Sequence, residues 1–211
     1  MPTVTNPGTD PEQALQQLYR ARRTPEFVEV PELSFLMIDG HGDPNHSERY
    51  RQAVQALYGV SYTLKFALKK QRGLDYRVAP LEGLWWAQDM TQFSSQRKAD
   101  WDWTMMIRQP AQVTPQLVEQ AAQEVAAKKR LPAARKLRLE RFTEGPAAQV
   151  LHLGPYSGEG PTIAALHGFI HEHRRRFDGR RHKHHEIYLS DPRRTAPERL
   201  KTIIRQPVSP A

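Results

Sequence analysis

The run HHEIYLSD at residues 184–191 has the spacing best suited to chemistry in this sequence. In a strand, alternate side chains face opposite sides, so His184, Glu186 and Tyr188 would share one face while Ile187 faces a core. A carboxylate beside indole rings loses hydration, which should raise its pKa towards the range of a general base. We therefore predict Glu186 as a catalytic carboxylate, with a surface glutamate in an edge strand as the alternative.

Four tryptophans in two short runs, LWWA and WDWT, suggest the walls of a site for an aromatic ligand. Most tryptophans pack in cores, where each indole N–H finds a partner. Four in two adjacent strand-like runs is nevertheless dense, and flat aromatic faces suit a planar polycyclic or cationic ligand. We predict that at least two line a groove, and that the ligand-binding residues are Trp85, Trp86, Trp101, Trp103, Met105, Tyr156 and Tyr188.

Tyr62 is the candidate that a helix would supply. Tyr58, Tyr62 and Phe66 recur every four residues, a pattern that more often packs against a sheet than contacts a ligand. Tyr62 lies off the main apolar stripe, so its phenol could hydrogen-bond a substrate carbonyl or guide an attacking water. We therefore place Tyr62 beside Glu186 as a catalytic candidate, with Tyr156 as a weaker one of the same kind.

The histidine-rich run RRHKHHE raises the question of a metal site. A His-x-His pair in a strand directs two imidazoles to one side, and Glu186 could supply a third ligand for His182 and His184. The surrounding basic residues disfavour a cation, and we find no second carboxylate nearby except Glu82, which would hold backbone or arginine groups in place. We expect no metal and no cofactor.

Several familiar kinds of active site are excluded by what the sequence lacks. It contains no cysteine, which excludes disulfides, thiolate metal sites and thiol nucleophiles. It also has no Gly-rich phosphate loop, no nucleophile elbow and no carboxylate pair of defined spacing. Any hydrolytic chemistry is therefore not encoded in a short motif.

The elements that must position these residues fall into two units of the same order. The first unit contains a strand from Leu33, a helix between Ser47 and Lys70, and the strand-like runs YRVAPLEGLWWA and WDWTMMIRQP. The second contains KLRLERF with AAQVLHLGPY, a helix led by Pro161, and the runs HHEIYLSD and LKTIIRQPV. Because both units end on Ile-Arg-Gln-Pro, we interpret them as a duplication.

This pattern predicts an α+β fold built from a repeated strand-helix-strand-strand unit. The repeats would span residues 33–110 and 136–208, joined by a helix over residues 114–130 that Thr114 caps, with residues 1–32 as a flanking arm. Such units can join their sheets about a pseudo-twofold axis. We expect an antiparallel sheet with helices on one face and a ligand groove on the other.

The formal charge of +8 raises the question of nucleic-acid binding. The basic runs at residues 128–130 and 174–176 end helical segments, where cations meet the helix dipole, and no nucleic-acid-binding signature accompanies them. No apolar run approaches the ~18 residues of a membrane span, and no signal peptide is evident. We expect a cytoplasmic protein without nucleic-acid or membrane partners, and leave a homodimer open.

Six stretches together resemble the GyrI-like (gyrase-inhibitor-like) family of small-molecule-binding domains, over roughly residues 33 to 208: LMIDGHGDPN, LYGVSYTLKFALKK, PLEGLWWA, WDWTMMIRQP, LHLGPYSGEGPTIAALHGFI and HHEIYLSDPRRTAPERLKTIIRQPV. In this family an acidic residue of a Glu-x-Tyr-Leu strand faces the ligand groove, and Glu186 occupies that position. The resemblance implies a duplicated fold, also similar to SOUL haem-binding proteins, with a groove for bulky organic molecules.

The resemblance also implies a choice between activities. Family members include drug-sensing domains of transcription activators, gyrase inhibitors, and hydrolases that open the cyclopropane ring of DNA-alkylating antibiotics. This sequence has no helix-turn-helix beside the resemblance, which favours a detoxifying cyclopropanoid cyclopropyl hydrolase. Glu186 would be its general base, and Tyr62 or Tyr188 would stabilise the phenolate that forms. The alternative is a non-catalytic drug-sequestering or sensing module, in which Glu186 pairs with a cationic ligand.

Overall fold

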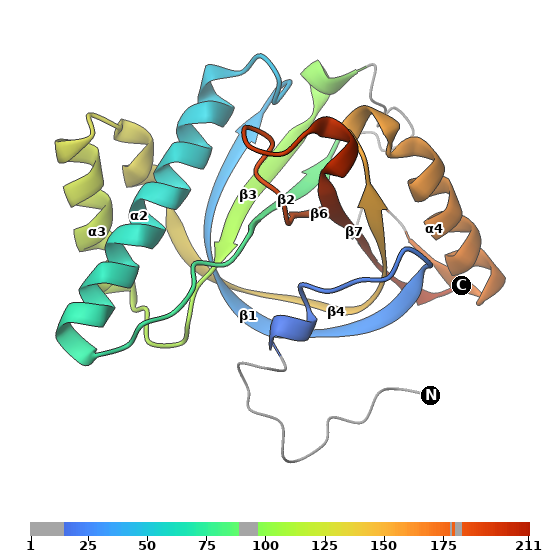
Figure 1. Cartoon of the computed structure of the whole chain (residues 1–211), viewed down its shortest axis with the longest axis horizontal. Coiled ribbons are helices and arrows are strands. Elements are labelled where there is room, and N and C mark those ends of the chain that lie inside the picture. The colour runs from blue at the N-terminus through green and yellow to red at the C-terminus, as the bar shows by residue number, and fades with distance from the viewer. Residues whose placement is uncertain (1–14, 89–96, 178, 180–182) are drawn as a thin grey trace.

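Six antiparallel strands close into a barrel in the order β1-β3-β2-β6-β7-β4, and helices pack on its outside (Figure 1). The structure, a computed structural model, describes residues 15–88, 97–177, 179 and 183–211. The barrel strands are β1 Glu26–His41, β2 Leu81–Trp86, β3 Asp102–Arg108, β4 Arg138–Leu153, β6 His184–Tyr188 and β7 Lys201–Pro207. The strands β5 Arg175–Arg176 and β8 Ser209–Pro210 form a separate two-stranded sheet.

The helices begin and end where local chemistry requires it. They are α2 Glu48–Arg72, α3 Pro115–Lys128 and α4 Gly160–Glu172, with short 3-10 turns η2 Lys98–Asp100, η3 Pro132–Lys136, η4 Tyr156–Gly158 and η5 Pro197–Arg199. Ser47 caps α2 by accepting a hydrogen bond from the Tyr50 amide, and α2 ends at Gly73, which adopts a left-handed conformation with φ 66°. Thr114 caps α3 as the sequence predicts, with Pro115 following it.

The expected repeat is present in the strand order. Each half runs strand, helix, strand, strand: β1, α2, β2 and β3, then β4, α4, β6 and β7. The halves join twice, through the pairs β2–β6 and β1–β4, which closes the barrel. The two Ile-Arg-Gln-Pro runs take equivalent places, because Ile107 lies opposite Leu36 and Ile204 lies opposite Val150.

Barrel closure gives the two faces of the sheet different roles. The outer face carries Leu36, Trp103 and Ile107, which pack in one buried cluster with residues of α2 and α3. The inner face carries a second cluster, formed by Phe35, Met37, Leu84 and Met106. Since side chains fill the inside of a six-stranded barrel, the face opposite the helices has no room for a groove.

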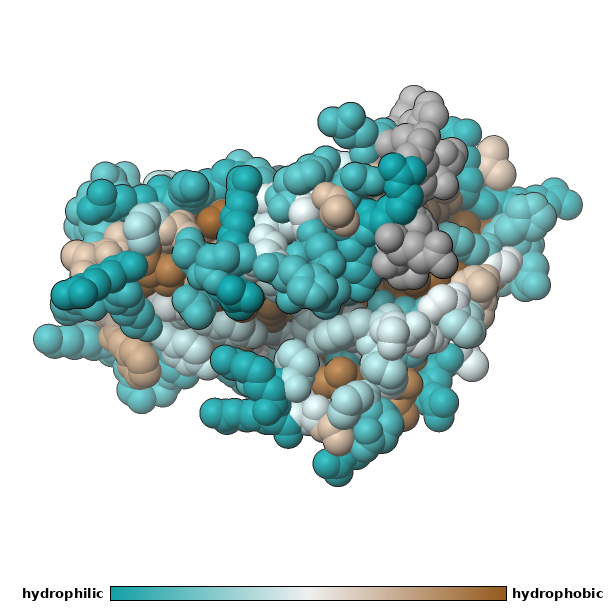
Figure 2. Space-filling view, turned by 90° about the horizontal axis from the view of Figure 1, so that it is seen from above, coloured by the Kyte–Doolittle hydropathy of each residue, from teal (hydrophilic) through white to brown (hydrophobic). Residues whose placement is uncertain are grey.

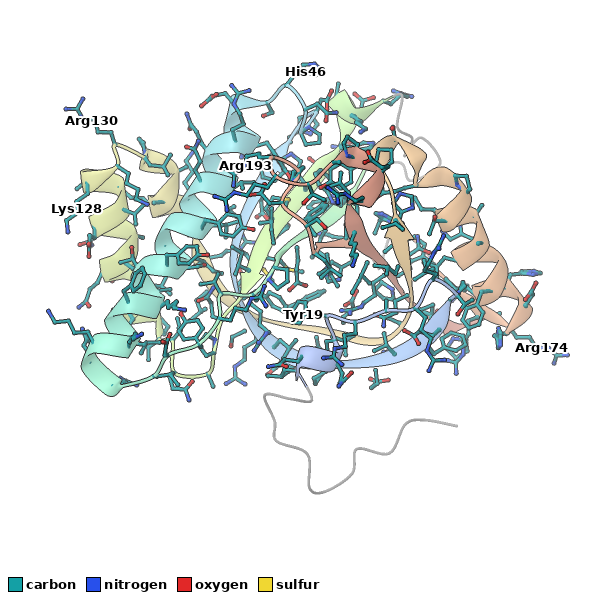
Figure 3. All side chains as sticks on the ribbon, viewed as in Figure 1. Tyr19, His46, Lys128, Arg130, Arg174 and Arg193 are labelled. Carbon is teal, nitrogen blue, oxygen red and sulfur yellow. The ribbon has the colours of Figure 1, made fainter. Side chains whose placement is uncertain are left out.

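Strand β1 begins at Glu26 rather than at Leu33. Its first residues pair with residues 145–149 of β4, so the end of the expected N-terminal arm is part of the barrel. Just before it, the Tyr19 hydroxyl donates to Glu82 of β2 at 2.8 Å and Arg205 of β7 donates to the Leu18 carbonyl, so this segment is hydrogen-bonded to the barrel (Tyr19 is labelled in Figure 3).

The basic runs noted in the sequence lie at opposite ends of the molecule. Lys128 is the last residue of α3 and Arg130 follows it, whereas Arg174 follows α4 on the other side of the barrel (Figure 3). None of the helices in the described part of the chain is long and apolar enough to cross a membrane.

Candidate active site

A groove opens between α2 and α4, over the paired strands β2 and β6. Its cavity volume of about 2130 Å³ exceeds the roughly 300–1,000 Å³ typical of small-molecule pockets. On the face of the molecule seen in Figure 2, polar side chains cover most of the surface, with apolar residues showing between them. The groove therefore lies on the helix-bearing face, whereas the sequence analysis expected the other face, which closure turns into the barrel interior.

Glu186 lies on the floor of this groove with a hydrogen-bond donor at each carboxylate oxygen. Nε2 of His184 lies 3.1 Å from Oε1 of Glu186, and the Tyr188 hydroxyl donates to Oε2 at 2.8 Å. Gln206 donates to Nδ1 of His184, which leaves the Nε2 hydrogen for Glu186. Strand alternation brings these three residues of β6 to one face, as expected.

The pKa of Glu186 is lowered, so the expected rise is wrong. Burial does raise the pKa of this carboxyl, but the hydrogen bonds from His184 and Tyr188, together with the charge of Lys98, outweigh burial. The expected rise rested on the loss of hydration beside aromatic rings alone. Glu186 is therefore ionised at neutral pH, the state that a general base needs, although it is a weaker base than an unperturbed glutamate.

Trp85 and Tyr188 extend the hydrogen-bond chain at Glu186. The Trp85 indole donates to the Tyr188 hydroxyl at 2.9 Å, and Tyr188 donates in turn to Glu186. Gly83 makes this geometry accessible, because a Cβ at that position would lie 2.7 Å from the Trp85 Nε1. Burial and the adjacent Glu186 charge hold the pKa of Tyr188 well above its ordinary value, so it remains a phenol that donates to the carboxylate.

The predicted aromatic residues divide between the groove and other places. Trp85 and Trp101 line the groove with their rings edge to face at 5.6 Å. Trp103 lies fully buried beneath α2 over Gly40, and Met105 is buried beside it. Trp86 points to the opposite face of the sheet, where the Lys183 ammonium lies 3.3 Å from its ring centroid.

Tyrosines from three elements complete the walls. Tyr156 packs edge to face on Tyr188 at 5.8 Å, and burial followed by the Glu186 charge raises its pKa to about 12. Tyr50 of α2 packs against Trp85 at 6.0 Å, and burial and the charge of Glu186 both raise its pKa. The sequence analysis did not single out Tyr50.

Tyr62 lies at the outer end of the groove, 47% exposed and stacked between Tyr58 and Phe66. Along α2 it is 12 residues, or about 18 Å, from Tyr50, the tyrosine of this helix that interacts with Glu186. The structure thus brings Tyr188, Tyr156 and Tyr50 to the carboxylate, and leaves Tyr62 at the entrance.

Glu159 is the functional candidate that sequence reasoning missed. It is 6% exposed, lines the groove at the start of α4, and interacts electrostatically with Glu186. Burial and then the Glu186 charge raise its pKa to about 9, although Lys98 opposes this. The sequence analysis found no carboxylate pair because the partners are far apart in the chain. In the sequence, Glu159 lies in Gly-Glu-Gly-Pro at the start of the helix led by Pro161, where an acid is an ordinary feature of a helix N-terminus, so no local signal singled it out.

A second set of buried ionisable groups lies inside the barrel, away from the groove. His185 lies 2.9 Å from Glu144 and 3.0 Å from Glu82, and Arg205 also pairs with Glu144. Glu82 thus binds His185 and Tyr19, rather than the backbone or arginine groups expected for it. Among the described residues no group of three or more His, Cys, Asp or Glu could hold a metal ion, and His182 lies outside them.

Comparisons with known proteins agree with this fold. Residues 23–209 match the family of GyrI-like small molecule binding domains. An uncharacterized conserved protein from Listeria innocua is 41% identical, with TM-score 0.86 over 94% of this chain and 98% of that chain. A hydrolase from Listeria innocua is 40% identical over the same shares, with TM-score 0.81.

More distant structures share the fold alone. The EcmrR C-terminal domain is 10% identical, with TM-score 0.55 over 89% of this chain and 98% of that domain. No curated protein matches the chain. The arrangement of aromatic rings around an ionised carboxylate must therefore be interpreted from its own geometry.

Proposed function

Because the chain belongs to the family of GyrI-like small-molecule-binding domains, we propose that its groove binds a planar aromatic molecule and hydrolyses a strained ring in it. The substrate would be a cyclopropanoid genotoxin, in which a cyclopropane ring and a cyclohexadienone ring share one spiro carbon. The observation that carries the proposal is Glu186, an ionised carboxylate on the floor of an aromatic groove.

The groove would orient the substrate before the reaction begins. Trp85, Trp101 and Tyr156 offer ring faces and edges on different sides of the groove floor, which suits a flat polycyclic ligand. His184 and Tyr188 hold the two oxygens of Glu186 in place. This fixed carboxylate can hydrogen-bond a water that faces the strained ring.

Glu186 would act as general base in the ring opening. It accepts a proton from water while the water oxygen bonds to the cyclopropane methylene carbon. The bond from this carbon to the shared ring carbon breaks, and its electron pair makes the six-membered ring aromatic. Positioned general bases contribute about 10²–10⁴-fold to rate, and ring strain and aromatisation lower the remaining barrier. The similarity to hydrolases from Listeria innocua supports hydrolysis over binding alone.

The test is turnover of a spiro-cyclopropyl cyclohexadienone by the purified protein, followed by chromatography and mass. Catalytic addition of one water is expected, with kcat falling about 10²–10⁴-fold in Glu186→Gln. Glu172→Gln is the matched control, because Glu172 is exposed at the end of α4. Full activity in Glu186→Gln would refute the role of Glu186.

The second candidate is a binding module without chemistry. An ionised carboxylate surrounded by Trp85, Trp101 and Tyr156 also suits an organic cation, through charge pairing and cation–π attraction. In that case the compound is recovered intact after tight binding. Binding of an aromatic cation that weakens in Glu186→Gln, without turnover of the cyclopropyl probe, would favour this alternative.

A further inference from the structure

Glu159 is a buried carboxylic acid that the surrounding protein leaves without a full set of partners. It forms part of the groove wall at 6% exposure, and its Oε1 has no hydrogen-bond partner among the described residues. An acidic side chain at a helix start ordinarily interacts with the free amides there, yet Glu159 makes no cap bond with α4. Its carboxyl group is therefore available to a ligand in the groove.

The groups that face Glu159 come from three elements. They are Glu186 and Tyr188 of β6, Lys98 of η2 and Tyr156 of η4. Burial and the negative charge of Glu186 keep a proton on Glu159, with a pKa of about 9, while hydrogen bonds hold Glu186 ionised. Two carboxyl groups with opposite protonation states are the arrangement in which one serves as acid and the other as base.

We propose that Glu159 is the general acid of the reaction in which Glu186 is the general base. Its carboxyl hydrogen-bonds the carbonyl oxygen of the bound dienone and transfers its proton to that oxygen as the ring opens. This role rests on the function proposed above and identifies the second residue that this function needs.

The two carboxyl groups together balance the proton transfers of one turnover. Glu186 takes a proton from water, the remaining hydroxyl adds to the methylene carbon, and the released electron pair reaches the dienone oxygen through the ring. Glu159 protonates that oxygen, so the product leaves as a neutral phenol bearing a hydroxymethyl group. Glu186 is then protonated and Glu159 ionised, and one proton passing from the first to the second through solvent restores the resting state.

Lys98 is suited to assist the acid without replacing it. Its charge lowers the pKa of Glu159, and its ammonium lies 5.4 Å from the ring centroid of Trp101 at the groove. A cation in this position stabilises the Glu159 carboxylate that forms on proton transfer. Lys98 is therefore a positioning residue for the acid.

A structural role for Glu159 predicts different behaviour from a catalytic one. A buried acid that only fills space can be replaced by the isosteric glutamine with no change in pH dependence. A general acid must be protonated to work, so kcat/KM should fall as pH rises through about 9, the pKa of Glu159. The glutamine variant should lose this alkaline limb, whereas Glu159→Asp should keep it in shifted form.

The experiment compares the pH profiles of wild type, Glu159→Gln, Glu159→Asp and the control Glu172→Gln on the same spiro-cyclopropyl dienone. We expect kcat/KM at pH 7 to fall about 10²–10³-fold in Glu159→Gln and to stay within twofold in the control. A second dienone that releases a more acidic phenol should show a smaller defect, because its oxygen needs the proton less. Circular dichroism and binding of the intact dienone at 4 °C verify the fold and the groove of each variant.

The outcomes separate this inference from the proposed function. If wild type turns over the dienone and Glu159→Gln keeps both its rate and its alkaline limb, the general-acid role is overturned while hydrolysis stands. If wild type shows no turnover, both the proposed function and the general-acid role of Glu159 are wrong. Carbon-13 NMR of the labelled glutamate carboxyls provides a further test, because titration of Glu159 below pH 6 would also overturn the inference.

Discussion

The inside of the barrel and the outer groove both bury carboxylates and a histidine, yet they treat charge differently. Inside the barrel, His185 lies between Glu82 and Glu144, and Arg205 balances the second of these acids. In the groove, Glu186 has donors at both oxygens, whereas Oε1 of its neighbour Glu159 has no partner in the described part of the chain. Complete pairing of the buried charges inside the barrel indicates a structural network. The unpartnered carboxyl oxygen in the groove indicates a ligand-binding site.

The difference arises because the barrel interior excludes solvent and ligands, whereas the groove does not. The barrel wall is closed by strand pairing, so each charge buried inside it must find a protein partner. The groove is open to solvent and ligands between α2 and α4, so a carboxyl can remain unpaired until a ligand arrives. Substitutions in the two regions should therefore change different properties.

The largest effect on stability is expected from Glu144→Gln, inside the barrel. This variant leaves His185 and Arg205 with one fewer counter-charge at a fully buried position, a change that typically costs about 3–5 kcal/mol. Urea unfolding followed by circular dichroism measures the loss. Glu159→Gln is the matched variant in the groove, and we expect no loss of stability from it at pH 7, because glutamine removes the cost of keeping a proton on a carboxyl that the unfolded chain would ionise. Equal losses in both variants would abolish the distinction between the regions.

Two buried groups should govern the pH dependence of stability, His185 inside the barrel and Glu159 in the groove, because each holds a proton in the folded protein that the unfolded chain releases at lower pH. Burial lowers the pKa of His185, but Glu144 and Glu82 outweigh burial and raise it to about 9. The stabilisation is therefore complete below the ordinary histidine pKa near 6.5 and is lost as pH rises through about 9. It amounts to something on the order of 3 kcal/mol.

The measurement is urea unfolding of wild type and His185→Gln between pH 6 and 9.5. Wild type should lose stability over this range, and the variant should be less stable at pH 6 and show a shallower loss, because the contribution of Glu159 remains. A wild-type curve that stays flat up to pH 9.5 would show that His185 is neutral in the folded protein.

The sequence predicted the repeat and the β6 face because both depend on local patterns. Alternation in HHEIYLSD separates Glu186 from Ile187 by itself, and the repeated Ile-Arg-Gln-Pro marks equivalent strands. Closure of the barrel depends on long-range pairing between the halves, for which no local pattern exists. The groove was therefore expected on the face that closure fills with side chains.

The protonation states could not be predicted for a similar reason. The lowered pKa of Glu186 depends on His184 and Tyr188 of its own strand and on Lys98, which is distant in the sequence. Glu159 is 27 residues before Glu186 in the chain and meets it only through the packing of α4 on the barrel. The positions of Trp85 and Trp86, by contrast, follow from a local pattern. Strand alternation alone places Trp85 in the groove and Trp86 on the opposite face.

The smallest effect distinguishes two tyrosines of α2. Tyr50 packs against Trp85 and interacts with Glu186, so loss of its hydroxyl in Tyr50→Phe should lower kcat/KM about fivefold to tenfold, equivalent to one hydrogen bond. Tyr62 is half exposed at the groove entrance, and Tyr62→Phe retains its stacking with Tyr58 and Phe66, so kcat/KM should stay within twofold. The two variants make the same chemical change on one helix and control for each other. A larger defect in Tyr62→Phe would mean that the substrate extends along α2 to the entrance, and that the phenol chosen from the sequence contacts it there.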